Sequence, residues 1–117
     1  MRRVLIVDDA AFMRMSIRLM LEKGGYQIVG EAENGFEGVE LYKELMPDLV
    51  TMDITMPIMS GIDALKAIIA FDSKAKVVMV SAMGQEIMVR EAVMSGAKTF
   101  IVKPFKQDTI LQIFSKL

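Results

Sequence analysis

The stretch LVTMDITMP, residues 49–57, holds the pattern from which both the fold and a candidate site can be predicted. It begins with apolar or β-favouring residues, which are typical of a buried strand. The carboxylate of Asp53 stands at the end of that run, shortly before a proline. A similar run, VLIVDD at residues 4–9, ends in Asp8 and Asp9. Because burial removes favourable hydration from a charged group, three carboxylates at two strand ends indicate one acidic site.

The composition is that of a globular protein. The 117 residues, 53% hydrophobic and 25% charged, suffice for one domain over residues 1–117 with a core of its own. A net charge of -1 argues against binding to nucleic acid or to an acidic membrane surface. The apolar run at residues 4–7 is too short for a signal peptide or a membrane span. We therefore expect a soluble, cytoplasmic, monomeric protein.

Cysteine and histidine are both absent from the sequence. Their absence excludes disulfides, thiolate and imidazole metal sites, Ser-His-Asp triads and any phosphohistidine within the chain. Any chemistry of this protein must therefore use carboxylates, hydroxyls and lysine.

Five short runs rich in Val and Ile alternate with longer stretches of helical periodicity. Continuous apolar strands with a helix between each pair predict a parallel sheet that helices cover on both faces. The fold class is thus α/β, a doubly wound, flavodoxin-like sheet of five parallel strands with five helices. The strand order 2-1-3-4-5 is assumed from general knowledge of such folds. The predicted strands cover residues 3–7, 27–31, 48–52, 76–80 and 99–102.

The helical stretches end at residues that commonly stop helices. Gly24–Gly25 follow the first stretch, Pro47 follows the second and Gly96 follows the fourth. Ser60, three residues before Asp63, is typical of a helix start. The predicted helices cover about residues 11–23, 35–46, 61–71, 85–95 and 106–116.

The chemically active residue types fall at the strand ends. Asp8 and Asp9 end the first strand, Asp53 the third and Ser81 the fourth, and Lys103 follows the fifth. In such sheets the ligand site lies at the carboxyl ends of the strands. Three clustered carboxylates repel one another unless a cation lies between them, and oxygen ligands completed by water suit Mg²⁺. A metal, a lysine, a hydroxyl and a nucleophilic carboxylate serve phosphoryl transfer, which predicts an aspartyl phosphate.

Each of these residues also has a purely structural interpretation. An aspartate after a strand often caps a turn or a helix. Ser81 can cap the helix that follows it, and Lys103 before Pro104 can be an ordinary exposed lysine. Position alone leaves the structural interpretation and the metal site both open.

Four motifs in order resemble the receiver domain of two-component response regulators. They are VLIVDDAAFMRM, TMDITMPIMSGIDAL, VSAMG and GAKTFIVKPF, and the resemblance spans essentially the whole chain. Within that family, the chain is most similar to the stand-alone chemotaxis receivers. The resemblance implies that Asp53 would accept a phosphoryl group and that Mg²⁺ would be held by Asp8, Asp9, Asp53 and the backbone carbonyl of Thr55. Ser81, where the family often has Thr, would hydrogen-bond to the phosphoryl group.

The same resemblance implies a switch and an output surface. Lys103 would pair with the phosphoryl group, and Phe100, where the family often has Tyr, would be the aromatic switch. A Phe at this position has no phenol hydroxyl with which to fix an inward rotamer. The output surface would be the predicted helix 85–95, the strand 99–102 and the helix 106–116.

The predicted helix 85–95 carries two apolar rows at i, i+4 spacing. Met88 and Ala92 form one row, and Val89 and Val93 form the other. If the Met88 row faces the core, then Val89 and Val93 are exposed and form an apolar patch that could bind a partner. Two further residues, which share one face of the strand 99–102, belong to the same patch. Those two residues are Phe100 and Val102. Alternatively, both rows are packed inside. The twelve Met residues are interpreted as adaptable core filler.

The function implied is that of a phosphorylation-activated chemotaxis response regulator. Its partners would be a chemotaxis histidine kinase, the flagellar motor switch protein and a phosphatase. It would be a signalling switch with self-catalysed phosphoryl transfer and autodephosphorylation, rather than a conventional enzyme.

Three other functions are weighed against this one, and the residues disfavour the second and the third. A phosphorelay receiver would pass its phosphoryl group to a second His protein. A small aspartyl-phosphate phosphatase would need a second Asp where Thr55 stands. A flavodoxin-like carrier would need hydroxyls and backbone donors after the first strand, where this chain has carboxylates.

Overall fold

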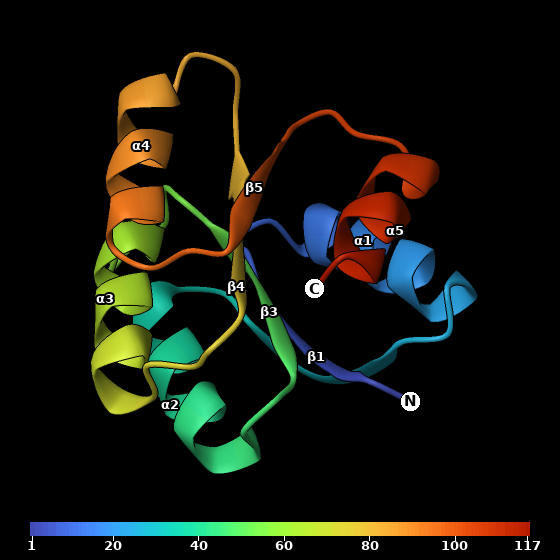
Figure 1. Cartoon of the computed structure of the whole chain (residues 1–117), viewed down its shortest axis with the longest axis horizontal. Coiled ribbons are helices and arrows are strands. Elements are labelled where there is room, and N and C mark those ends of the chain that lie inside the picture. The colour runs from blue at the N-terminus through green and yellow to red at the C-terminus, as the bar shows by residue number, and fades with distance from the viewer.

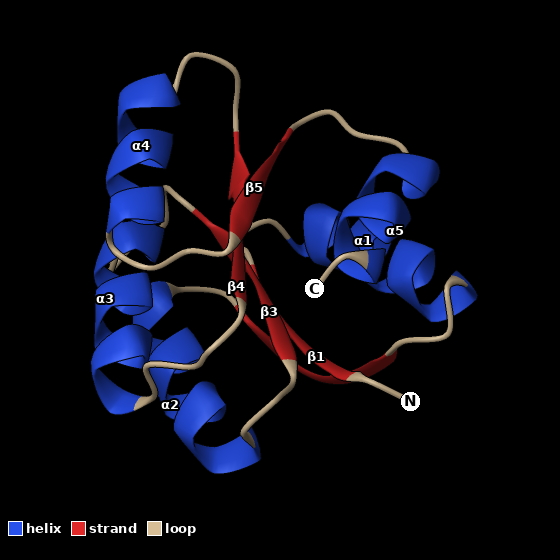
Figure 2. Cartoon of the chain, in the orientation of Figure 1, coloured by secondary structure: helices blue, strands red, loops and turns tan.

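The computed structural model describes all 117 residues, Met1–Leu117, as a sheet between two layers of helices (Figures 1 and 2). Five parallel strands lie in the order β2-β1-β3-β4-β5, which confirms the predicted class and strand order. Each predicted element lies within one residue of the observed bounds. The strands are β1 (Arg3–Val7), β2 (Gln27–Ala32), β3 (Leu49–Asp53), β4 (Val77–Ser81) and β5 (Thr99–Val102), and the helices are α1 (Ala11–Lys23), α2 (Gly35–Leu45), α3 (Gly61–Phe71), α4 (Glu86–Met94) and α5 (Gln107–Ser115).

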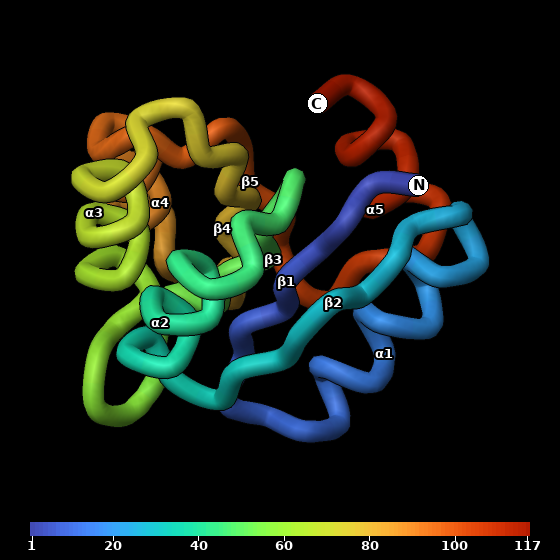
Figure 3. The backbone as a smooth tube through the Cα atoms, turned by 90° about the horizontal axis from the view of Figure 1, so that it is seen from below, coloured from blue at the N-terminus to red at the C-terminus, as the bar shows by residue number.

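The sheet lies between two layers of helices in the view from below (Figure 3), and it divides the core into two clusters. Val4 and Ile6 of β1 belong to the layer under α1 and α5, whereas Leu5 and Val7 belong to the layer under α2, α3 and α4. Side chains of a strand alternate between the two faces, so the strands, which are covered on both sides, contain few polar residues.

The observed helix ends follow from local residue chemistry. The Ser60 hydroxyl accepts a hydrogen bond from the Asp63 N–H at 3.2 Å, which confirms the predicted start of α3. Asn34 caps α2 in the same way through the Glu37 N–H at 2.9 Å. Helix α2 ends at Leu45, and the next residue, Met46, caps it with a positive φ of 46° that reverses the chain before the proline.

Gly61 fixes the distance between the end of β3 and the start of α3. Its N–H donates a hydrogen bond to the Ile54 carbonyl at 2.7 Å. A Cβ atom at this position would overlap the carbonyl oxygen of Asp53. Only glycine lets α3 begin so close to the backbone that carries Asp53.

The interpretation of the twelve Met residues as core filler is wrong for half of them. Only three are buried: Met52, Met56 and Met79. Six are exposed instead: Met1, Met15, Met46, Met83, Met88 and Met94. The remaining three, Met13, Met20 and Met59, are partly buried and pack against the core. The Met residues are therefore divided equally between the core region and the exposed surface.

No helix of the protein combines the length and the apolar character that a membrane crossing requires. The longest, α1, has 13 residues, whereas a span needs about 20.

Candidate functional site

Three carboxylates meet where β1 and β3 end. Asp8, Asp9 and Asp53 each offer an oxygen atom, and these atoms lie within 4.8 Å of one another. Strands β1 and β3 are parallel neighbours, so their carboxyl ends meet at the same sheet edge. Asp8 and Asp53 are buried, whereas Asp9 is exposed. The three residues that the sequence analysis singled out at these strand ends thus form one cluster.

Burial opposes ionisation of Asp53, which is only 8% exposed. Loss of hydration raises the pKa of its carboxyl group to about 6, and the negative charges of Asp8 and Asp9 act in the same direction. A divalent cation would relieve this repulsion. Oxygen-only ligands with one exposed member leave room for water, which is the coordination that Mg²⁺ prefers. The residues at this site therefore fit Mg²⁺.

Lys103 bridges the two buried carboxylates. Its Nζ lies 3.1 Å from Asp8 Oδ2 and 3.6 Å from Asp53 Oδ1. Its backbone N–H donates to the Ser81 carbonyl at 2.7 Å, which continues the pairing of β5 with β4. The positive charge lowers the pKa of Asp53 and thus opposes the effect of burial. The ammonium group is well placed to pair with an anion attached to Asp53.

Ser81 ends β4 with a buried side chain that makes no hydrogen bond inside the protein. It follows Met79 on the side of the sheet that α3 and α4 cover. Helix α4 begins after Gln85 and has no side-chain cap, so Ser81 is not a helix cap. Its hydroxyl is therefore free to donate a hydrogen bond at the edge of the carboxylate cluster.

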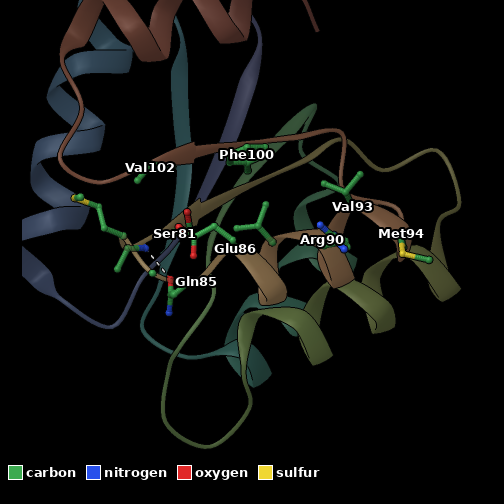
Figure 4. Close-up of a pocket in the computed structure, with 12 residues that line it drawn as sticks. Ser81, Gln85, Glu86, Arg90, Val93, Met94, Phe100 and Val102 are labelled. Atoms are coloured by element: carbon green, nitrogen blue, oxygen red, sulfur yellow. Dashed lines mark hydrogen bonds between the residues drawn. The ribbon is translucent and has the colours of Figure 1, made fainter.

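Gln85, labelled in Figure 4, connects the loops that follow β3 and β4. Its Oε1 accepts a hydrogen bond from the Ala82 N–H at 2.6 Å, and its Nε2 donates to Thr55 Oγ1 at 3.1 Å. Its carbonyl accepts from the Val89 N–H in the first turn of α4 at 2.9 Å. The loop two residues beyond Asp53 is thus joined to the start of α4. No sequence motif marks this contact, which sequence analysis missed.

An apolar groove of about 470 Å³ runs between α4 and β5 (Figure 4). Ser81 lines the groove next to the loop that carries Gln85. Three exposed side chains that the sequence analysis assigned to a partner surface also line it: Val93, Phe100 and Val102. Phe100 and Val102 share a face of β5 as predicted, and Ile101 is buried on the other. The groove and the carboxylate cluster are therefore adjacent through β4.

The predicted core row of α4 is wrong. Met88 is 39% exposed, whereas Val89 is only 8% exposed and packs in the core together with Ala92. The buried residues are therefore three apart, and the row of Met88 with Ala92 is split between core and solvent. Val89 belongs to the core, where it lies beneath the groove, rather than to an exposed patch.

Comparison with known proteins identifies the family. The model of the response regulator receiver domain matches residues 4–115. Chemotaxis protein CheY of Thermotoga maritima is 58% identical over 116 residues, which cover 99% of this chain and 97% of that protein. Protein CcdB of Bacillus subtilis is 56% identical over 117 residues, which cover 100% of this chain and 98% of that protein.

A solved structure agrees with this result. In the CheX-CheY-BeF3-Mg²⁺ complex from Borrelia burgdorferi, the matching chain is 42% identical with a TM-score of 0.94. The match covers 98% of this chain and 87% of that chain. Because the family model spans nearly all residues and the two curated relatives match over 97–98% of their lengths, the chain belongs to the response regulator receiver domains and, among them, to the CheY-like chemotaxis receivers.

Proposed function

We propose that this protein is a phosphorylation-activated chemotaxis switch that accepts a phosphoryl group on Asp53. The observation that carries the proposal is the buried carboxylate of Asp53, which lies against two further carboxylates and the Lys103 ammonium. All 117 residues would form one receiver domain that acts in the cytoplasm.

The transfer needs an ionised nucleophile. Since the pKa of Asp53 is raised to about 6, the carboxylate is mostly ionised at neutral pH and remains more basic than an ordinary aspartate. One of its oxygens forms the new bond to phosphorus, while the bond from phosphorus to the donor nitrogen breaks and the nitrogen keeps the electron pair. Lys103 lies 3.6 Å from the Asp53 oxygen and would pair with the transferred group.

The metal site would be formed by the same cluster. Asp8, Asp9, Asp53 and the backbone carbonyl of Thr55 would hold Mg²⁺, which would neutralise the charge on the phosphoryl oxygens. Support comes from the donor set, which contains only oxygen and carries excess negative charge. The Borrelia burgdorferi relative, which is described in a complex with BeF3 and Mg²⁺, adds to this support.

The phosphoryl donor would be a chemotaxis histidine kinase. This chain contains no histidine, so the donor imidazole has to belong to another protein. Hydrolysis of the aspartyl phosphate, with or without a phosphatase, would reset the switch. The CheX-containing complex of the Borrelia burgdorferi relative supports binding of a further protein to the receiver.

The signal would leave through α4, β5 and α5. A phosphoryl group on Asp53 would attract the unpaired hydroxyl of Ser81, which lines the groove and directly follows Val80, the residue paired with Asp53. Gln85 provides a second connection, because it joins Thr55 and Ala82 to the first turn of α4. Phe100, now exposed in the groove, would then turn inward. The proposed partner is the flagellar motor switch protein.

A binding measurement tests this proposal. A labelled peptide from the motor switch protein is titrated with the wild type and with Asp53→Asn, in acetyl phosphate and Mg²⁺. We expect phosphorylation to tighten binding of the wild type at least tenfold, about 1.4 kcal/mol, with no change for Asp53→Asn. Phosphoryl transfer to a histidine phosphotransferase without any gain in peptide binding would instead establish a phosphorelay role.

A further inference from the structure

The peptide that joins Asp8 to Asp9 is held by a single hydrogen bond. The Asp8 carbonyl accepts it from Arg14 Nη1 at 2.7 Å. The Asp8 carboxylate has its own partners, the Ala10 N–H at 2.9 Å and Lys103 Nζ at 3.1 Å. The exposed Asp9 carboxylate has no hydrogen bond or ion pair. The orientation of Asp9 therefore depends on the backbone that Arg14 holds.

Arg14 is itself fixed from β2. Its Nε lies 3.2 Å from Glu31 Oε1, and its side chain is only 16% exposed. Arg18, one turn further along α1, takes the other oxygen of Glu31 at 2.6 Å. Glu31 thus orients two guanidinium groups, but Arg18 makes no contact with the carboxylate cluster.

We propose that Arg14 is a positioning residue for the cation site: it holds the Asp8–Asp9 peptide so that both carboxylates point at the same ion. The inference rests on the proposed function, because it assumes that Asp8 and Asp9 hold Mg²⁺. A planar guanidinium can bind the carboxylate of Glu31 and the carbonyl of Asp8 at once through separate N–H groups. Outer contacts of this kind typically change metal affinity 10- to 100-fold when they are removed.

The sign of the effect separates this role from simple electrostatics. Arg14 carries a positive charge near the cluster. If charge were its only contribution, its removal would make the site more negative and would tighten Mg²⁺ binding. Loss of positioning would instead weaken binding, because the ligands must be ordered when the ion arrives. If Mg²⁺ binds more weakly after the Arg14 guanidinium is removed, charge alone therefore cannot explain the result.

The experiment is a Mg²⁺ titration of the full chain, followed by backbone amide chemical shifts. We expect Arg14→Met to raise the dissociation constant for Mg²⁺ at least tenfold. Arg14→Lys keeps the charge but cannot bind both partners in the same geometry, so it should lose most of the affinity as well. Arg18→Met is the matched control, since it removes an equal charge from the same Glu31, and should stay within twofold of the wild type.

A second readout distinguishes positioning from catalysis. In phosphorylation by acetyl phosphate, the Arg14 variants should need more Mg²⁺ for half-maximal rate but reach a maximal rate within twofold of the wild type. Unchanged or tighter Mg²⁺ binding by Arg14→Met, or full affinity in Arg14→Lys, would overturn the positioning role alone. A wild type that binds no Mg²⁺ would overturn the proposed function and this inference together.

Discussion

Replacement of Asp53 by Asn should stabilise the metal-free protein in a pH-dependent manner. The Asp53 carboxyl has a pKa of about 6 in the folded state, against 3.8 for an ordinary aspartate. Between these values the folded protein retains a proton that the unfolded chain has released, so rising pH favours unfolding. The difference corresponds to about 3 kcal/mol of stability lost once the pH exceeds 6. Asp53→Asn does not ionise and escapes this loss.

Urea denaturation at several pH values in EDTA provides the assay. The gain in unfolding free energy of Asp53→Asn over the wild type should grow from about 1.5 kcal/mol at pH 5 to about 3 kcal/mol at pH 8. Asp108→Asn, an exposed aspartate in the first turn of α5, should change by about 0.5 kcal/mol or less at either pH. Added Mg²⁺ should stabilise the wild type more than Asp53→Asn. A gain that does not depend on pH would refute the reasoning.

Three further substitutions test the packing around the site. The Thr51 hydroxyl is fully shielded from solvent and has no hydrogen-bond partner, so Thr51→Val should raise the unfolding free energy by about 1 kcal/mol in urea denaturation. A loss of stability would mean that the hydroxyl has an unseen partner. Ile58, 83% exposed, adopts a φ of 70°, which is unfavourable for a β-branched residue and tolerated by Asn. Ile58→Asn should therefore stabilise the protein by about 1 kcal/mol, and an unchanged melting temperature would contradict that strain. Gly61→Ala would force a methyl group against the Asp53 carbonyl, so we expect a loss of about 3 kcal/mol together with slower phosphorylation by acetyl phosphate; wild-type values for both would show that α3 shifts freely.

The fold could be predicted from sequence because each element satisfies one simple periodicity. Doubly covered strands such as LVTMD and VVMVS read as continuous apolar runs, and Ser60 marks a helix start. The carboxylate cluster was equally accessible, because parallel strands bring their carboxyl ends to one edge. The strand order was not accessible from the residues, since any order of five similar apolar strands would satisfy the same pattern.

Contacts between side chains and loop backbone were beyond sequence analysis. Arg14 donates a hydrogen bond to the Asp8 carbonyl, and Gln85 accepts one from the Ala82 N–H. Neither the type of these residues nor their spacing in the sequence predicts such a contact. The wrong expectation that Met88 of α4 faces the core together with Ala92 has a related cause. Met88 and Val89 are adjacent apolar residues, and the rotation of the helix about its axis, which packing determines, decides which of them is buried.

Phosphoryl acceptance by Asp53 is the central claim, and intact-mass spectrometry tests it most directly. The wild type and Asp53→Asn are incubated with acetyl phosphate, with Mg²⁺ and with EDTA. The account predicts a mass gain of one phosphoryl group in the wild type with Mg²⁺, and none in Asp53→Asn or in EDTA. An equal gain in Asp53→Asn, or no gain by the wild type under any condition, would contradict the claim.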